Sequence, residues 1–425
     1  MSRALIHFER PQPEVLSSLY WLNLGVSLLM MFLLVIAAPA LGLLYKSSAL
    51  AHVLQAASLM FPLTALGQQF RVLAEKELRF SSVAANEIAA GALGFCVAIP
   101  VALVGGGVYA LVAGMLATAA VSSLLAWLLL SDGHRPSLRF HAAETGRYLR
   151  YGGYMVGENF ANVLNRQADV FIGGIVLGPA AMGPFSLPRD LSLRTGTIIN
   201  QIITRVGFPV MARVQNDPIR LRSIYLQTLR MTASVNFPVY VALALFADEI
   251  VALLYGPQWR DAGRYLRILA LWGMVRSVGQ PIGNLLYAVG MARQALWWNL
   301  MQLLLFPPLY WLATRSGGLY GLAVSLLVTQ IAIFLPAWRW LVLPACGAGL
   351  LEFLLQTAMP LLLALAAGAI AALATAGIDT APWRLLVGGS VGALCYVGLS
   401  FVFNRRWVDA MIELTRLKAV WKSLT

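Results

Sequence analysis

The sequence predicts an all-α polytopic membrane protein with about twelve transmembrane helices. Three observations support this fold class. Hydrophobic residues make up 59% of the 425 residues and charged residues only 12%, a balance far from that of soluble proteins. The apolar residues gather in segments near the roughly 20 residues that a membrane-spanning helix needs. The basic residues alternate between the connections that join these segments, which is the pattern of a membrane topology signal.

The twelve predicted spans follow a polar segment at residues 1–17. They lie at about 18–44, 50–72, 82–105, 107–130, 151–177, 181–204, 226–247, 265–289, 295–313, 319–340, 352–376 and 382–403. The second, sixth and eighth spans are less hydrophobic than the others. They hold Gln68, Gln69, Arg189, Arg194, Asn200, Arg276, Gln280 and Asn284. We therefore expect these three spans to pack inside the protein rather than against lipid.

The basic residues orient the chain. If the tail after residue 403 is cytoplasmic, the segments on that side hold 20 lysines and arginines, against 5 on the other side. This positive-inside bias predicts that both termini are cytoplasmic. The net charge of +13 follows this alternation, so we do not expect a nucleic-acid partner.

The sequence contains no cofactor or metal motif. Cys96, Cys346 and Cys395 are scattered, the four histidines are isolated, and no glycine-rich phosphate-binding loop is present. We expect no cofactor, and coupling of a transport step to H⁺ or Na⁺ stays open.

The most informative segment is the fifth span, because it is long enough to cross a bilayer yet strongly polar on one face. At about 100° per residue, four positions share a narrow stripe and a fifth lies at its edge. These are Glu158, Asn162, Asn165, Asp169 and, at the edge, Arg166. A charge at the centre of a span costs about 2.5–3.5 kcal/mol, so the stripe must face the protein interior or a wet cavity. The simplest alternative is an Arg166–Asp169 ion pair that only joins helices.

Two more arginines lie on polar helix faces in the same half of the chain. Arg189 shares a face with Ser192, Gly196 and Asn200, and Arg276 shares a face with Gln280, Gly283, Asn284 and Tyr287, where Pro281 predicts a kink. Guanidinium groups match phosphate oxygens and stay charged in dry surroundings. Arg166, Arg189 and Arg276 therefore predict a cavity for an anionic, phosphate-bearing substrate. The alternative is that each pairs with Asp169, Asp190 or Glu158 and only fixes packing.

Three carboxylates are candidates for a coupling-ion site or an ion pair. Asp169 and Glu158 lie on the fifth span, and Glu87 lies in the third span, within about two turns of its cytoplasmic end. The alternative for Glu87 is a side chain that extends to the membrane interface.

An internal repeat divides the chain. Residues 43–45 (LLY) recur at 253–255, and residues 107–111 (GVYAL) recur as the similar GLYGL at 318–322, at offsets of 210 and 211. The repeat maps spans one to four onto spans seven to ten, as in parallel-repeat transporters. The predicted organisation is a cytoplasmic segment (1–17), a four-helix first lobe (18–130), a basic linker (131–150), a six-helix second lobe (151–340), two further helices (341–403) and a basic cytoplasmic tail (404–425).

Several motifs together resemble a known family. They are YWLN at 20–23, ELRF at 77–80, the N-x-x-x-D-x-x-I-G-x-x-x-L-G run from Asn165 to Gly178, PVMAR at 209–213 and GPQW at 256–259. In order and spacing the chain resembles the polysaccharide exporters, or Wzx-type oligosaccharide-lipid flippases, of the multidrug/oligosaccharidyl-lipid/polysaccharide (MOP) superfamily. The resemblance covers essentially the whole chain.

The resemblance implies a MATE-like arrangement of two six-helix lobes around a cavity, followed by two helices. Relative to that pattern the first lobe lacks its first two helices. It also implies a protein of the bacterial inner membrane that exports a polyprenyl-diphosphate-linked oligosaccharide for lipopolysaccharide or exopolysaccharide synthesis, alongside a polysaccharide polymerase and glycosyltransferases. Arg166, Arg189 and Arg276 would then meet the diphosphate, and Asn165, Gln280 and Asn284 would hydrogen-bond diphosphate or sugar.

We expect a transporter and not an enzyme. One alternative is an ion-coupled exporter of small organic cations from the same superfamily, which an arginine-rich cavity disfavours because it would repel cations. A second is an inactive membrane scaffold for glycan assembly. An integral glycosyltransferase is a third, although the longest outer loop, around Asp248 and Asp261, looks too short for a sugar-nucleotide site.

Overall fold

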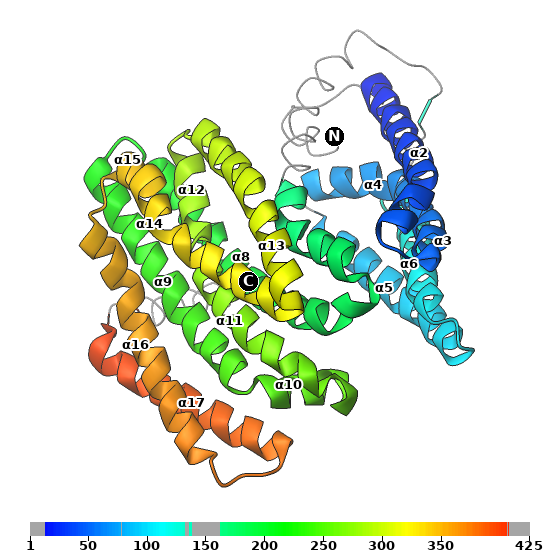
Figure 1. The fold of residues 1–425 in the computed structure, drawn as a ribbon. Helices are drawn as coiled ribbons and strands as arrows, with labels where there is room; N and C mark the ends of the chain where they lie inside the picture. The colour runs from blue at the N-terminus through cyan, green and yellow to red at the C-terminus, as the bar shows by residue number, and fades with distance from the viewer. Residues whose placement is uncertain (1–12, 78, 132–135, 138–161, 406, 408–425) are drawn as a thin grey trace. The chain divides into compact units, whose positions relative to one another are not determined.

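The computed structural model describes residues 13–77, 79–131, 136–137, 162–405 and 407. Regular structure in these residues is entirely helical, which confirms the predicted all-α class. The chain forms two compact units, Met1–Val163 (unit 1) and Leu164–Thr425 (unit 2). Figure 1 shows the helices of each unit. The boundary between the units falls inside the predicted fifth span.

Unit 1 is a small helical bundle. Its helices are α2 (Pro13–Leu44), α3 (Ser48–Ser58), α4 (Met60–Lys76), α5 (Phe80–Leu103) and α6 (Val108–Leu129). The α5–α6 hairpin is the most extensive pairing, α4 packs along α6, and α2 packs on α3 and α4. Ser47 begins α3 as an N-cap, because its side chain accepts a hydrogen bond from the Leu50 N–H.

An aromatic cluster joins the helices of unit 1. Tyr20 of α2, Phe70 of α4 and Trp127 of α6 have ring centroids 4.8–6.2 Å apart. The Trp127 indole N–H also donates to the Leu66 carbonyl at 2.9 Å. Such ring pairs contribute about 0.5–1.5 kcal/mol beyond the area they bury, so the cluster helps to fix α2 against the other helices.

Unit 2 contains the remaining helices. Residues 162–177 are helical and are followed by η1 (Ala180–Met182), α8 (Gly183–Arg213), α9 (Pro218–Leu245), α10 (Ala247–Tyr255), η2 (Pro257–Ala262), α11 (Gly263–Ser277), α12 (Gln280–Ala288), α13 (Ala292–Ala332), α14 (Phe334–Ala337), the π-helical η3 (Trp338–Val342), α15 (Leu343–Cys346), α16 (Leu350–Ala374) and α17 (Ala381–Phe403). Asp217 and Pro218 start α9: the Asp217 carboxylate accepts from the Arg220 N–H, and Pro218 lacks the donor that the first helical position leaves unpaired.

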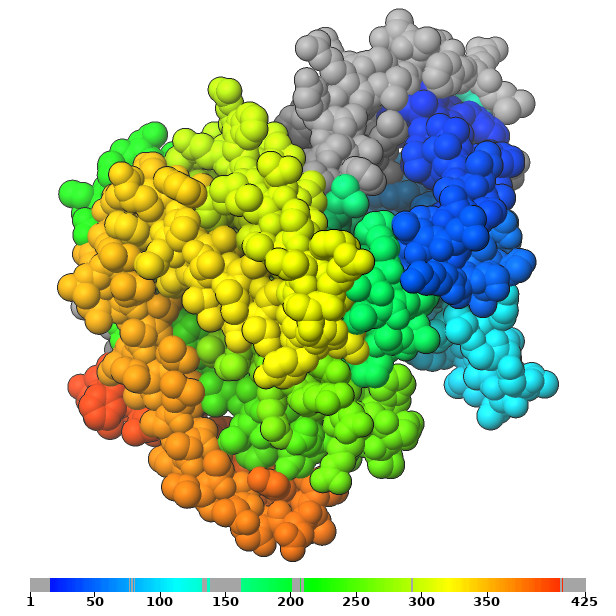
Figure 2. Space-filling view, viewed as in Figure 1, coloured from blue at the N-terminus to red at the C-terminus, as the bar shows by residue number. Residues whose placement is uncertain are grey.

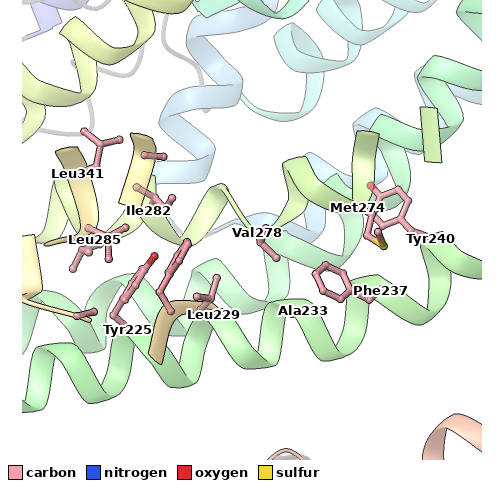
Figure 3. Packing of buried hydrophobic residues seen from close by; sticks show 14 of the residues in the cluster. Tyr225, Leu229, Ala233, Phe237, Tyr240, Met274, Val278, Ile282, Leu285 and Leu341 are labelled. Atoms are coloured by element: carbon pink, nitrogen blue, oxygen red, sulfur yellow. The ribbon is translucent and has the colours of Figure 1, made fainter. Parts of the chain in front are cut away.

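Helix α9 is the centre of unit 2 (Figure 3). One stripe of α9, spaced by four, four, four and three residues, packs against α11 and α12. It comprises Tyr225, Leu229, Ala233, Phe237 and Tyr240, and it meets Met274, Val278, Ile282 and Leu285. Helices α16 and α17 also pack on α9, where the Tyr396 hydroxyl donates to the Ser234 carbonyl at 2.7 Å. With both sides covered, α9 is protected from lipid along most of its length.

The described residues contain seven helical segments long and apolar enough to cross a membrane, or eight if the pair α9–α10, bent by 80°, counts as one. One segment, Arg293–Cys346, is 54 residues long and covers the predicted ninth and tenth spans. Figure 2 shows α13 and α16 at the surface of unit 2, where they expose leucines such as Leu304, Leu312 and Leu362. These segments indicate a multi-pass membrane protein. The number of twelve membrane-spanning helices stays a prediction. Helices α8 and α11 carry several charges, and part of the fifth span lies outside the described residues.

The two halves of the sequence repeat share an unusual backbone. Gly107, before α6, has φ 50° and ψ −126°, and Gly318 has φ 59° and ψ −144° at a kink that divides α13 into two helices. The other matched pair also ends at a residue with positive φ: Lys46 (φ 52°) follows the first LLY motif and Gly256 (φ 95°) follows the second. The sequence repeat thus coincides with positive φ at the same place in each copy.

We predict that Gly318→Ala destabilises the protein by about 1–3 kcal/mol, because residues with a Cβ rarely adopt this backbone conformation. Its neighbour provides a matched control. Gly317 is helical, its φ is not in the positive range, and an added Cβ would meet open space. Gly317→Ala should therefore be neutral or stabilising by up to about 1 kcal/mol. Thermal unfolding in detergent measures both, and equal effects would contradict the prediction.

Candidate functional site

A buried ion pair joins the first helix of unit 2 to α8. Asp169 is 3% exposed and Arg189 is 2% exposed. Arg189 Nη2 donates to Asp169 Oδ1 at 2.8 Å, and Nε donates to Oδ2. This two-point geometry fixes the direction of both side chains.

Arg189 makes two further contacts inside the protein. Its Nη2 donates to the backbone carbonyl of Arg166, and its Nη1 lies 3.6 Å from the Asp190 carboxylate. The partner of Asp169 is therefore Arg189 on a facing helix, and not Arg166 one turn away on its own helix, which was the alternative raised from the sequence. The packing alternative raised for Arg189 describes its geometry well, because Arg189 has little capacity left for a ligand.

Arg166 and Arg276 are in a different situation. Arg166 is exposed and Arg276 is partly buried, and neither side chain makes an ion pair within the part of the chain that the structure describes. Arg276 nevertheless lies close enough to Arg166, Asp169 and Arg189 to interact electrostatically with them. The structure thus brings all three predicted arginines together. Both Asp169 and Asp190 lie against Arg189, so the described residues of this cluster keep a net positive charge, and no described carboxylate forms an ion pair with Arg166 or Arg276.

A break between two helices positions Arg276. The predicted eighth span is interrupted after Ser277, and α12 starts at Gln280 with Pro281 in its first turn. Arg276 therefore lies in the last turn of α11, where the helix dipole favours a cation. The Arg276 guanidinium carbon lies 5.4 Å from the ring centroid of Trp272, in a cation–π contact.

Two buried amides are linked to the backbone at this break, one directly and one through the other. Asn200 of α8 donates to the Ser277 carbonyl at 3.4 Å, and Asn236 of α9 donates to Asn200 Oδ1 and to the Thr232 carbonyl, both at 2.9 Å. Carbonyls that lose their helical partner inside a membrane protein need such replacements. This polar contact is a physical reason for the predicted sixth and eighth spans to pack inside the protein.

The other predicted site residues are placed as follows. Asn165 Nδ2 donates to the Asn299 carbonyl at 3.3 Å, Asn284 is half-buried and has an interaction partner, and Gln280 is exposed. Glu158 lies outside the described residues. Glu87 belongs to unit 1, so it is not part of this cluster within unit 2.

Sequence reasoning missed two aromatic residues near Arg276. Trp272 is four residues before Arg276, and this i,i+4 spacing on a helix is a signal that could have identified the contact. Tyr310 of α13 interacts electrostatically with Arg276, and its hydroxyl lies 3.4 Å from Thr329 Oγ1. Tyr310 sits in an apolar segment, and nothing in its sequence neighbourhood singles it out.

We predict that Asp169→Asn or Arg189→Met alone costs about 3–5 kcal/mol of stability, because each leaves one buried charge without its partner. The double variant should lose much less than the sum of the two, since it removes both charges. Thermal unfolding and size-exclusion chromatography in detergent test this. Arg166→Gln is the control and should change stability little; a loss as large as that of Asp169→Asn would contradict the assignment of the pair.

The chain is similar to known proteins of polysaccharide biosynthesis and transport. The family model described as polysaccharide biosynthesis protein matches residues 1–264, more than half of the chain. The lipopolysaccharide biosynthesis protein WzxC of Escherichia coli is 28% identical over 82% of this chain and 71% of its own length. The teichuronic acid biosynthesis protein TuaB of Bacillus subtilis is 27% identical over 93% and 83%. The succinoglycan biosynthesis transport protein ExoT of Rhizobium meliloti is 22% identical over 98% and 85%. Because the family model matches more than half of the chain, the chain belongs to the polysaccharide biosynthesis protein family.

Proposed function

We propose that this protein flips a polyprenyl-diphosphate-linked oligosaccharide across the bacterial inner membrane during surface polysaccharide synthesis. The observation that carries the proposal is the pair of arginines, Arg166 and Arg276, neither of which forms an ion pair with a described residue although they interact electrostatically with each other. A diphosphate supplies the missing negative charge. The relatives are named for different glycans, so a phosphate-bearing carrier is the part of the substrate most suited to a shared cationic site.

The side chains of the site have separate roles in this proposal. Arg166 and Arg276 hold the diphosphate. Asn165 precedes Arg166, and Gln280 and Asn284 follow Arg276 within eight residues, so we assign them hydrogen bonds to the diphosphate or the sugar. Arg189 positions rather than binds, because it is buried and its Nε and Nη2 groups donate to Asp169 and to the Arg166 carbonyl. No covalent bond of the substrate changes, so the protein is a transporter and not an enzyme.

We further propose that the chain crosses the membrane about twelve times with both termini in the cytoplasm. The matching backbone at Gly107 and Gly318 supports a repeat of two lobes, which is the architecture of alternating-access carriers. Coupling to H⁺ or Na⁺ would use Glu158 in preference to Asp169, because both oxygens of Asp169 already accept hydrogen bonds from Arg189. A polysaccharide polymerase and glycosyltransferases are the proposed partners.

Two other functions are less consistent with the site. An exporter of organic cations would bring a cation against Arg166 and Arg276, which repel it. An inactive scaffold for glycan assembly would have no need for two charges that nothing in the described residues neutralises. Arg276 is partly buried, and partial burial of a charge is costly unless a partner or a ligand pairs with it.

Complementation of a flippase-deficient bacterium, scored as surface polysaccharide, tests the proposal. We predict that Arg166→Gln and Arg276→Gln each reduce the polysaccharide by at least roughly tenfold, the effect of losing one charge-assisted hydrogen bond. Arg276→Lys should retain part of the activity, because it keeps the charge but loses the planar fork.

Arg220→Gln is the matched control. Arg220 is an exposed arginine in the first turn of α9 whose ion-pair partner among the described residues is Asp217, three residues earlier, so its loss should leave polysaccharide levels unchanged. Full activity of the Arg166→Gln, Arg276→Gln double variant at normal protein levels would overturn the proposed role of the cationic site.

A further inference from the structure

A second candidate binding site lies within unit 1. Helices α4, α5 and α6 surround an open cavity of about 490 Å³. Its walls are mainly apolar or small residues, among them Met60, Phe95, Ala98, Leu111 and Met115. The proposed function does not use this cavity.

Two charged residues line the cavity, one of each sign. Arg71 Nη1 donates to Ser122 Oγ at 3.2 Å, but Arg71 Nε is buried and has no hydrogen-bond partner in the described part of the chain. Glu87 of α5 also lines the cavity. No ion pair joins Arg71 to Glu87 or to any other residue that the structure describes. The cavity therefore presents a separate positive and negative group, each with capacity for a ligand.

The two charges lie at the same end of the bundle. Arg71 is near the end of α4 (Met60–Lys76), Glu87 is near the start of α5 (Phe80–Leu103), and only a short loop joins these helices. From Glu87 the apolar wall of α5 continues to Ala98, which at 1.5 Å per residue is about 16 Å. This length is about half of the roughly 30 Å hydrocarbon core, the depth of one leaflet.

We propose that this cavity binds one phospholipid with a phosphoethanolamine headgroup. The phosphate bonds to Arg71, the ammonium group donates to the Glu87 carboxylate, and an acyl chain lies along the apolar wall. An anionic lipid such as phosphatidylglycerol leaves Glu87 unpaired beside its phosphate. A choline headgroup offers Glu87 no N–H donor. A polyprenyl diphosphate carries negative charge only, so the site is distinct from the proposed substrate site.

Native mass spectrometry of the purified, delipidated chain tests the proposal. The protein is mixed with equal amounts of phosphatidylethanolamine, phosphatidylcholine and phosphatidylglycerol with identical acyl chains. We expect a roughly tenfold preference for phosphatidylethanolamine in the first bound lipid, the effect of one charge-assisted hydrogen bond. Because the ratio is read within one spectrum of the folded protein, it does not depend on how much of a variant folds.

The variants separate the two contacts. Glu87→Gln should abolish the preference over phosphatidylglycerol, and Arg71→Gln should weaken the first binding event for all three lipids. Glu75→Gln is the control, because Glu75 is an exposed carboxylate near the end of α4 that does not line the cavity. It should leave the preference unchanged.

Three results would overturn the proposal. One is equal binding of the three lipids to the unaltered protein, and another is an unchanged preference in Glu87→Gln. The third comes from water-soluble phosphoethanolamine at millimolar concentration: if it displaces the bound lipid completely, the site recognises a free phosphate ester and not a lipid. Failure of these tests leaves the proposed transport function untouched, since they involve neither Arg166 nor Arg276.

Discussion

The ion pair between Asp169 and Arg189 is the interaction on which the candidate site depends. It is almost fully buried, so it is stable only while the two helices hold both partners in place. The same guanidinium binds the backbone carbonyl of Arg166, which ties the helix carrying Arg166 to α8. Because Asp169 is occupied by Arg189, it does not form an ion pair with Arg166 or Arg276. In the proposed function this contact separates the arginine that positions from the two that bind the diphosphate.

Much of this could be predicted from helical periodicity. A polar stripe on an apolar span has to face the protein, and Asp169 and Asn200 are indeed buried. The choice of partner could not be predicted in the same way. Arg166 and Arg189 are both compatible with Asp169 in sequence, and only the packing of α8 against residues 162–177 brings Arg189 into two-point contact. Similarly, periodicity identified Arg276, but Tyr310 reaches it from α13 through tertiary packing.

The interruptions of the helical backbone could be predicted only in part. Pro281 predicted a kink, whereas the structure has a full interruption between α11 and α12. Asn200 donates a hydrogen bond to a backbone carbonyl at this interruption, and Asn236 donates to Asn200. At Gly107 and Gly318 the repeated sequence motif coincides with a backbone conformation that favours glycine. A weak sequence repeat therefore gains weight once each copy shows the same local geometry. The number of membrane crossings depends on polar helices such as α8, which hydropathy alone does not identify.

In the function we propose, Arg166 and Arg276 form a diphosphate site beside the Asp169–Arg189 ion pair. The most direct measurement is the affinity of the purified chain for a short polyprenyl diphosphate, compared with the monophosphate of the same chain length, by isothermal titration calorimetry in detergent. We expect tighter binding of the diphosphate, and loss of that preference in the Arg166→Gln, Arg276→Gln double variant. Equal affinity for both ligands, or a preference that survives the double substitution, would contradict it.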